Sequence, residues 1–271
     1  MNRGTDFSFD ERIVSLYNRQ RAHPPEIARQ IGAAIMAQLP DGARLLEIGI
    51  GTGRIGWPVA AAGGRVTGFD LSAQMLSQVY GDERPAEIAG ALALAQADMQ
   101  QMPFAADSFD GALAVHVLHL AQDWQRVIRE VARVLRPGGV FIQGDDWIDP
   151  ASVVGRLRDE LRMHAVRLDP NLMPPAAGIS KAQALADLGG TDVTEIVVAE
   201  WTAMISPAER LATVEARIDA ESWIFTDAQF AQVLDHLRGF AADLWPNLDE
   251  QQPVTRRFVL KITRGAWHTG G

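Results

Sequence analysis

The sequence has no cysteine, only two lysines and no long apolar run among its 271 residues. Without cysteine the chain cannot form disulfides, zinc–thiolate sites or a thiol nucleophile. No apolar stretch approaches the roughly 20 residues that a membrane-spanning helix needs. The first ten residues hold no apolar segment before a small-residue cleavage site, so we expect no signal peptide. These absences favour a cytoplasmic protein with no membrane partner.

The charge balance is acidic, with 25 basic against 34 acidic residues and a formal net charge of −9. An acidic surface repels phosphate backbones, and two isolated lysines form no cluster that could contact them. We therefore expect no nucleic-acid partner. Like charges also keep copies of a soluble chain apart, which leaves a monomer or a homodimer open.

Short apolar runs alternate with helical patterns from residue 44 onward. The runs that we expect to form buried strands are residues 44–49, 65–70, 92–96, 109–115 and 140–144. Between the last two runs, apolar residues at helical spacing over 124–135 predict a helix. Parallel strands joined by helices pair with right-handed crossovers, so the sequence predicts an open α/β sheet.

The regions on either side are expected to be mainly helical. Helix-capping residues and apolar stripes predict two helices before residue 44, the first ending at His23-Pro24-Pro25. Further helices are expected at residues 154–168, from Pro207, and around 230–240, with strands at 192–204 and 254–263.

A glycine-rich turn follows the first expected strand, in Leu45-Leu46-Glu47-Ile48-Gly49-Ile50-Gly51-Thr52-Gly53. Glycine permits a positive φ and lets a ligand approach the backbone closely. The N-terminus of the next helix favours anionic or polar ligand groups. Since open α/β sheets bind ligands at the carboxyl ends of their strands, the turn predicts a nucleotide-type site.

Two features of this region suit more than one cofactor. Gly51, Gly53 and Gly56 match the dinucleotide fingerprint G-x-G-x-x-G. Asp70 ends the second expected strand, where a carboxylate can accept hydrogen bonds from ribose hydroxyls. Both features indicate a nucleoside-bearing ligand, which includes nicotinamide cofactors and S-adenosylmethionine.

Three further features distinguish between these cofactors. Glu47 stands two residues before the first glycine, and Asp98 follows the third expected strand. An ordered block then runs from Met102-Pro103-Phe104 to Leu135-Arg136-Pro137-Gly138-Gly139. With them, residues 45–144 resemble the class I S-adenosylmethionine-dependent methyltransferases, in the branch that includes the ubiquinone and menaquinone biosynthesis methyltransferases. The resemblance implies a Rossmann-like, doubly wound sheet of seven strands with the last antiparallel, and methyl transfer to oxygen, nitrogen or carbon of a small molecule.

The resemblance also implies which residues bind S-adenosylmethionine. They are Tyr17, Glu47, Gly49, Gly51, Gly53, Asp70, Leu71, Asp98, Met99 and His116. Glu47 and the three glycines would hold the methionine end of the cofactor. Asp70 would bind the ribose hydroxyls, with Leu71 against the adenine. Asp98 would accept from the adenine amino group, with Met99 packed on the ring.

Two aromatic residues would complete this site. His116, just past the fourth expected strand, would contact the cofactor and face the substrate, so it is the catalytic candidate. Tyr17 matches a tyrosine in the N-terminal lid of such enzymes. His116 and His119 have spacing suited to a metal, but the sequence offers no third ligand and we expect no metal. The acids Asp145 and Asp146, after the fifth strand, could act as a base or bind a cationic acceptor.

The resemblance suggests one methyltransferase domain over residues 1–271. Residues 1–43 would be N-terminal lid helices, 44–144 the cofactor-binding core, and 145–271 the remaining strands with a helical cap over the acceptor pocket. Two other functions stay open. A non-catalytic protein would bind S-adenosylmethionine without transfer, and an NAD(P)-dependent oxidoreductase would use the G-x-G-x-x-G match, although no Tyr-x-x-x-Lys proton relay is evident.

Overall fold

The computed structural model describes residues 22–79, 90–170, 172, 182–218 and 220–267. The first expected helix, with Tyr17, lies outside them. The chain divides into two compact units. The core unit comprises residues 8–145, 177–199 and 258–271, and the helical unit comprises 1–7, 146–176 and 200–257. Among the described residues, no helix combines the length and apolar character needed to cross a membrane.

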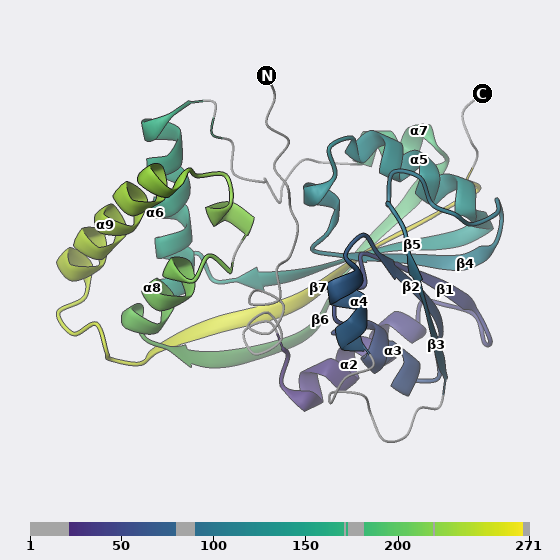
Figure 1. The fold of residues 1–271 in the computed structure, drawn as a ribbon. Helices are drawn as coiled ribbons and strands as arrows, with labels where there is room; N and C mark the ends of the chain where they lie inside the picture. The colour runs from purple at the N-terminus through teal and green to yellow at the C-terminus, as the bar shows by residue number, and fades with distance from the viewer. Residues whose placement is uncertain (1–21, 80–89, 171, 173–181, 219, 268–271) are drawn as a thin grey trace. The chain divides into compact units, whose positions relative to one another are not determined.

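Seven strands form one sheet in the order β3-β2-β1-β4-β5-β7-β6 (Figure 1). They are β1 (Arg44–Ile48), β2 (Arg65–Asp70), β3 (Ala91–Gln96), β4 (Phe109–Val115), β5 (Leu135–Ile148), β6 (Gly190–Ile205) and β7 (Gln252–Gly265). The strands from β3 to β5 pair in parallel, and the last strands are antiparallel. This arrangement confirms the predicted Rossmann-like sheet.

Parallel pairing brings the carboxyl ends of β1, β2 and β4 together at one edge of the sheet, and β5 continues beyond them to Ile148. Ile48 at the end of β1 pairs with Phe69 of β2 and with Ala114 of β4. Val115 at the end of β4 pairs with Gly144 of β5. The loops that leave β1, β2 and β4 therefore begin side by side.

Helices flank the sheet in the core unit, with α2 and α3 on one face and α5 and α7 on the other (Figure 1). The helices of this unit are α2 (Pro25–Met36), α3 (Gly56–Ala61), α4 (Ala73–Val79), α5 (Trp124–Val134) and α7 (Ala182–Asp187). Helix α2 begins at Pro25, where proline lacks only an N–H that the first turn leaves unpaired. Gly32 lets it approach α3 closely, because a Cβ there would lie 2.2 Å from the carbonyl oxygen of Pro58.

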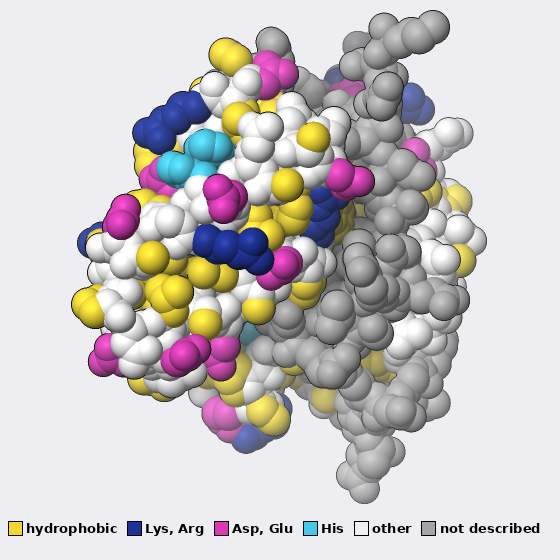
Figure 2. All heavy atoms as spheres, turned by 60° about the vertical axis from the view of Figure 1, so that its left-hand side comes forward, with side chains coloured by type: hydrophobic (Ala, Val, Ile, Leu, Met, Phe, Trp, Pro, Cys, Tyr) yellow, Lys and Arg dark blue, Asp and Glu magenta, His cyan; other side chains and the backbone are white. Residues whose placement is uncertain are grey.

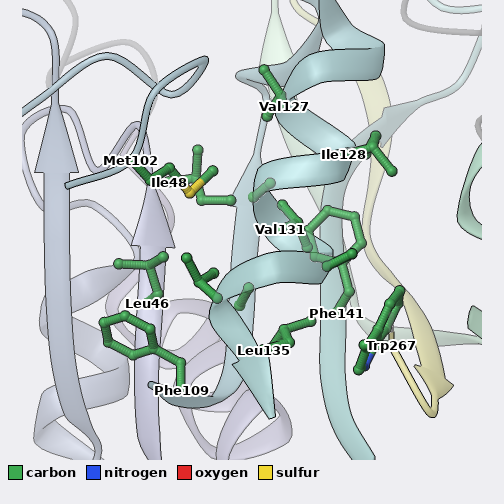
Figure 3. Packing of buried hydrophobic residues seen from close by; sticks show 14 of the residues in the cluster. Leu46, Ile48, Met102, Phe109, Val127, Ile128, Val131, Leu135, Phe141 and Trp267 are labelled. Atoms are coloured by element: carbon green, nitrogen blue, oxygen red, sulfur yellow. The ribbon is translucent and has the colours of Figure 1, made fainter. Parts of the chain in front are cut away.

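The main hydrophobic core lies between α5 and the sheet (Figure 3). The helical stripe predicted from sequence supplies Val127, Ile128 and Val131, which are fully buried. They pack in the same cluster as Leu46 of β1. Trp267 closes the cluster and donates a hydrogen bond from Nε1 to the Gly139 carbonyl oxygen at 2.6 Å. This packing fixes the end of β1, from which the glycine-rich turn starts.

The fifth strand is longer than predicted. It was expected at residues 140–144 and instead spans Leu135–Ile148. Leu135 already pairs with Phe109, and an irregularity precedes the next pair, Gly111 with Val140. The predicted turn is present within that irregularity, where Gly138 has a φ of 81°.

The helical unit has its own hydrophobic core, formed by α6 (Val153–Leu168), α8 (Pro207–Glu215) and α9 (Asp227–Leu244). Ser206 and Thr226 form capping boxes at the start of α8 and α9, as their sequences predict. On the face in Figure 2, described acidic and basic side chains alternate with hydrophobic ones, and neither sign of charge forms a continuous patch.

Candidate functional site

The glycine-rich turn has the backbone conformation that its sequence predicts. Gly49, Gly51 and Gly53 have φ angles of 63°, 57° and 86°, in the left-handed region that side chains disfavour. Gly49 is also confined, because a Cβ there would lie 2.3 Å from a methyl carbon of Val117. The turn leads directly from β1 to α3 and leaves backbone groups close to any ligand.

Asp70 is held against this turn by two backbone hydrogen bonds. Its Oδ2 accepts from the Gly51 N–H and its Oδ1 from the Ser72 N–H, each at 2.9 Å. Burial raises the pKa of Asp70, and the backbone donors oppose that shift. The carboxylate is therefore oriented at the junction of β1 and β2, beside the turn.

Glu47 lies beneath the turn and is almost completely buried, with 3% of its surface exposed. Burial raises its pKa to about 8; the positive charge of Arg54 lowers it and the negative charge of Asp70 raises it. Its Oε2 makes no hydrogen bond to any residue that the structure describes. A buried carboxyl oxygen of this kind is chemically suited to a cationic ligand group.

Contacts of Gly56 explain the chance match to the dinucleotide fingerprint. A Cβ on Gly56 would lie 2.7 Å from Glu47 Oε2 and 2.9 Å from Ile50 Cδ1. A Cβ on Gly68 of β2 would lie 2.2 Å from the same Ile50 atom. The two glycines thus make room for Ile50, which stands where the resembling family often has cysteine or alanine, and for the Glu47 carboxyl group.

The residues expected to bind adenine lie in the loops after β2 and β3. Leu71 is 69% exposed, which is unusual for a leucine, and its carbonyl oxygen accepts from Gln96 Nε2 at 3.0 Å. Asp98 follows β3 and accepts from the Gln100 N–H through Oδ1 at 2.8 Å. Met99 packs against the main core. Asp70 pairs with Gln96 in the β2–β3 register, so both loops start from one place.

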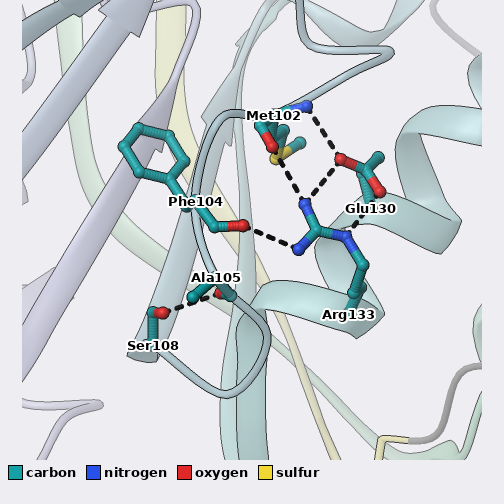
Figure 4. A network of polar contacts seen from close by, with 6 residues as sticks. All are labelled: Met102, Phe104, Ala105, Ser108, Glu130 and Arg133. Atoms are coloured by element: carbon teal, nitrogen blue, oxygen red, sulfur yellow. Dashed lines mark hydrogen bonds and ion pairs between the residues drawn. The ribbon is translucent and has the colours of Figure 1, made fainter.

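The loop after Asp98 is held by Glu130 and Arg133 of α5, which sequence reasoning missed (Figure 4). Arg133 donates to the carbonyl oxygens of Met102 and Phe104 at 3.0 and 2.7 Å. Glu130 accepts from Arg133 at 2.7 Å and from the Met102 N–H at 2.8 Å. The arginine in α5 was the available signal, but its partners are backbone groups, which leave no mark in a sequence.

His116 stands at the carboxyl end of β4 with a φ of 50°, rare for a residue with a side chain. Its Nδ1 lies 3.5 Å from Oδ1 of Asp145, the residue after Gly144 on the neighbouring strand. His119 lies in the short 3-10 helix Leu118–Leu120. Within the described ranges, no group of three or more His, Asp or Glu side chains is arranged to hold a metal ion.

The sites predicted from sequence therefore gather at one sheet edge, except Tyr17, which lies outside the described residues. Residues 46–143 match the family model described as a methyltransferase domain. This part of the core unit is therefore similar to methyltransferase domains. The match supports the resemblance to class I S-adenosylmethionine-dependent methyltransferases, for which S-adenosylmethionine is the cofactor.

The chain is also similar to curated proteins that are named as methyltransferases. The chain is 32% identical over 145 residues to "Sterol methyltransferase-like 3" of Botryococcus braunii, a match covering 53% of this chain and 36% of that protein. It is 35% identical over 117 residues to "27-O-demethylrifamycin SV methyltransferase" of Amycolatopsis mediterranei, covering 43% of each. The chain thus spans less than half the length of both relatives.

Solved structures share the fold of the domain. The YcgJ protein of Bacillus subtilis superimposes with a TM-score of 0.53 at 20% identity, over 88% of this chain and 99% of that one. At this identity the likeness concerns the fold alone.

Proposed function

We propose that the protein transfers a methyl group from S-adenosylmethionine to oxygen, nitrogen or carbon of a small-molecule acceptor. The observation that carries the proposal is the buried Glu47 carboxyl group beneath a turn hydrogen-bonded to Asp70. Two relatives are named for sterol and rifamycin methylation, which supports a small acceptor.

The motif block at residues 102–139 favours the quinone-methyltransferase branch as the finer assignment. Cytoplasmic location, the homodimer and the lid–core–cap division stay predictions.

The side chains present suit S-adenosylmethionine. Glu47 offers the ammonium group of the methionine part a buried oxygen that bonds to no described residue. The turn glycines leave room for that part against the backbone, and Asp70 offers carboxylate oxygens to the ribose hydroxyls. Leu71 has an exposed apolar surface for the adenine, with Asp98 for its amino group and Met99 behind it.

Positioning is the main task of these residues. The bound cofactor supplies a methyl group on a positively charged sulfur, which an aligned nucleophile can displace. Holding the reacting atoms about 3–3.5 Å apart in line can contribute roughly 7–11 kcal/mol to the barrier reduction. Few catalytic side chains are then needed.

His116 is proposed as the general base for an acceptor that must lose a proton. If the ring proton is on Nδ1, which lies 3.5 Å from Asp145 Oδ1, Nε2 carries the lone pair that takes the proton. His116→Ala should then lower kcat at least tenfold, by a larger factor than it weakens binding of S-adenosylhomocysteine. Asp145→Asn should give a smaller loss. An unchanged kcat in His116→Ala would exclude His116 as the general base, and catalysis would then rest on positioning of the cofactor and the acceptor.

The proposed function is tested by calorimetric titration with S-adenosylmethionine, S-adenosylhomocysteine and NADH. We expect both adenosyl ligands to bind, Asp70→Ala to abolish binding, and Asp235→Ala, an exposed change in α9, to leave it intact. Transfer is then assayed with labelled S-adenosylmethionine and small acceptors. Binding without transfer to any acceptor favours the non-catalytic alternative, whereas binding of NADH alone overturns the proposal in favour of an oxidoreductase.

A further inference from the structure

His23, at the entry to α2, contacts Arg54, the residue that follows the glycine-rich turn, although the two are 31 positions apart in the sequence. Nη1 of Arg54 lies 3.0 Å from Nε2 of His23 and 3.4 Å from its Nδ1. The His23 ring also packs edge-on against Phe258, with ring centroids 5.3 Å apart. Phe258 is fully buried, so one side of the ring rests on a rigid support.

The chemistry of this contact fixes the state of the histidine. A guanidinium group only donates hydrogen bonds, so a His23 nitrogen that accepts from Arg54 belongs to a neutral ring. Protonation of His23 would replace the hydrogen bond with two adjacent positive charges. The charges of Arg54 and Asp70 both act on the buried Glu47 carboxyl group, Arg54 lowering its pKa and Asp70 raising it.

We propose that His23 is a positioning residue of the cofactor site, which in its neutral form holds the Arg54 guanidinium beside Glu47. The Arg54 charge favours the ionised form of Glu47, and an ionised Glu47 is the form that attracts an ammonium group. Loss or protonation of His23 removes this contact to Arg54, so that the Arg54 charge acts less strongly on Glu47 and Glu47 is more often neutral. The inference rests on the proposed function, because the ammonium group belongs to the cofactor.

The test is a double-mutant cycle on His23 and Arg54, with affinity for S-adenosylhomocysteine measured by calorimetry between about pH 6 and pH 9. We expect His23→Ala to weaken binding roughly two- to tenfold. It should also move the midpoint of the affinity–pH curve upward, as Arg54→Ala should. In an Arg54→Ala background, His23→Ala should have no further effect. His23→Gln, which keeps an acceptor near the Nε2 position, should restore most of the affinity.

Several results would overturn the inference. Losses that add in the double variant would mean that His23 does not act through Arg54. An unmoved pH midpoint, or no rescue by His23→Gln while melting temperatures stay equal, would reduce His23 to a structural residue. Failure of the wild-type protein to bind S-adenosylhomocysteine would instead refute the proposed function, so the two failures are distinguishable.

Discussion

Burial of Glu47 links the stability of the protein to pH. The unfolded chain releases this proton near pH 4.5, whereas the native protein keeps it until about pH 8. The native state therefore binds more protons in this range, and the free energy of unfolding falls as pH rises through it. Glu47→Gln should remove this contribution. The free energy of unfolding of both proteins, measured with denaturant at several pH values, tests this. If it fell equally with pH in both, Glu47 would not be a buried neutral acid.

Gly56 and Gly239 offer the same substitution with opposite expected signs. Gly56→Ala places a Cβ 2.7 Å from Glu47 Oε2, so we expect a loss of about 1–3 kcal/mol in unfolding free energy and weaker cofactor binding. Gly239 lies exposed within α9, and a Cβ added there would meet nothing within 4 Å, so Gly239→Ala should stabilise by up to about 1 kcal/mol. Thermal denaturation should give a lower melting temperature for Gly56→Ala and a higher one for Gly239→Ala than for the wild type. A shift of the same sign in both would contradict the prediction.

At the residue scale, the sequence predicts the role of a residue when the local backbone conformation itself demands that residue type. The positive φ of Gly49, Gly51 and Gly53 was predictable because only glycine adopts it easily. The steric role of Gly56 was not, because it depends on side chains from β1 and the turn that only the fold brings together. Contacts of His23 were hidden for the same reason.

The loop between β3 and β4 depends on α5 for its shape. Arg133→Ala would leave the carbonyl groups of Met102 and Phe104 without their charged donor, so we expect a loss of about 1–3 kcal/mol. Arg133 also lowers the pKa of Glu130, so its stabilising contribution should disappear as pH falls through that lowered value. Arg129→Ala, on an exposed position of the same helix, is the control. If Arg133→Ala and Arg129→Ala lost the same unfolding free energy in urea, Arg133 would not have the role given to it here.

Helices α6 and α9 share a second pH-dependent contact. The rings of His164 and His236 stack with centroids 4.0 Å apart, and His236 Nε2 lies 2.7 Å from Glu160. Burial, then the charges of His236 and Arg167, lower the pKa of His164, while Glu160 opposes them. The native state therefore resists protonation, and stability should fall as pH drops below 6.5. Replacing His164 by Gln should reduce the loss of melting temperature at low pH, measured by circular dichroism. An unchanged loss would mean that other groups cause the pH dependence.

Helices and strands were predictable where the apolar residues kept a single helical or strand spacing along the whole segment. The stripe on α5 and the capping boxes of α8 and α9 predicted helices that the structure contains. The length of β5 was not predictable, because its first residue pairs across an irregularity that interrupts the apolar run. The order of the strands in the sheet was not predicted, since pairing partners of strands far apart in sequence leave no local pattern.

For the whole molecule, the proposed cofactor site predicts stabilisation by ligand. S-adenosylhomocysteine at a hundred times its Kd should raise the unfolding free energy by about 2.7 kcal/mol, because it binds only the folded chain. Asp70→Ala should abolish the rise in melting temperature measured by scanning fluorimetry. An equal rise in this variant would show that the ligand binds elsewhere.

Three of the borders between the two units fall inside strands, and the other two lie outside the described residues. The three lie between residues 145 and 146, 199 and 200, and 257 and 258, within β5, β6 and β7 respectively. A one-residue slip in any of these strands would turn its side chains to the opposite face of the sheet. The helical unit therefore cannot be exchanged between relatives as a cassette cut at surface turns. A chimera, whether made by recombination or by design, has to preserve three strand registers at once.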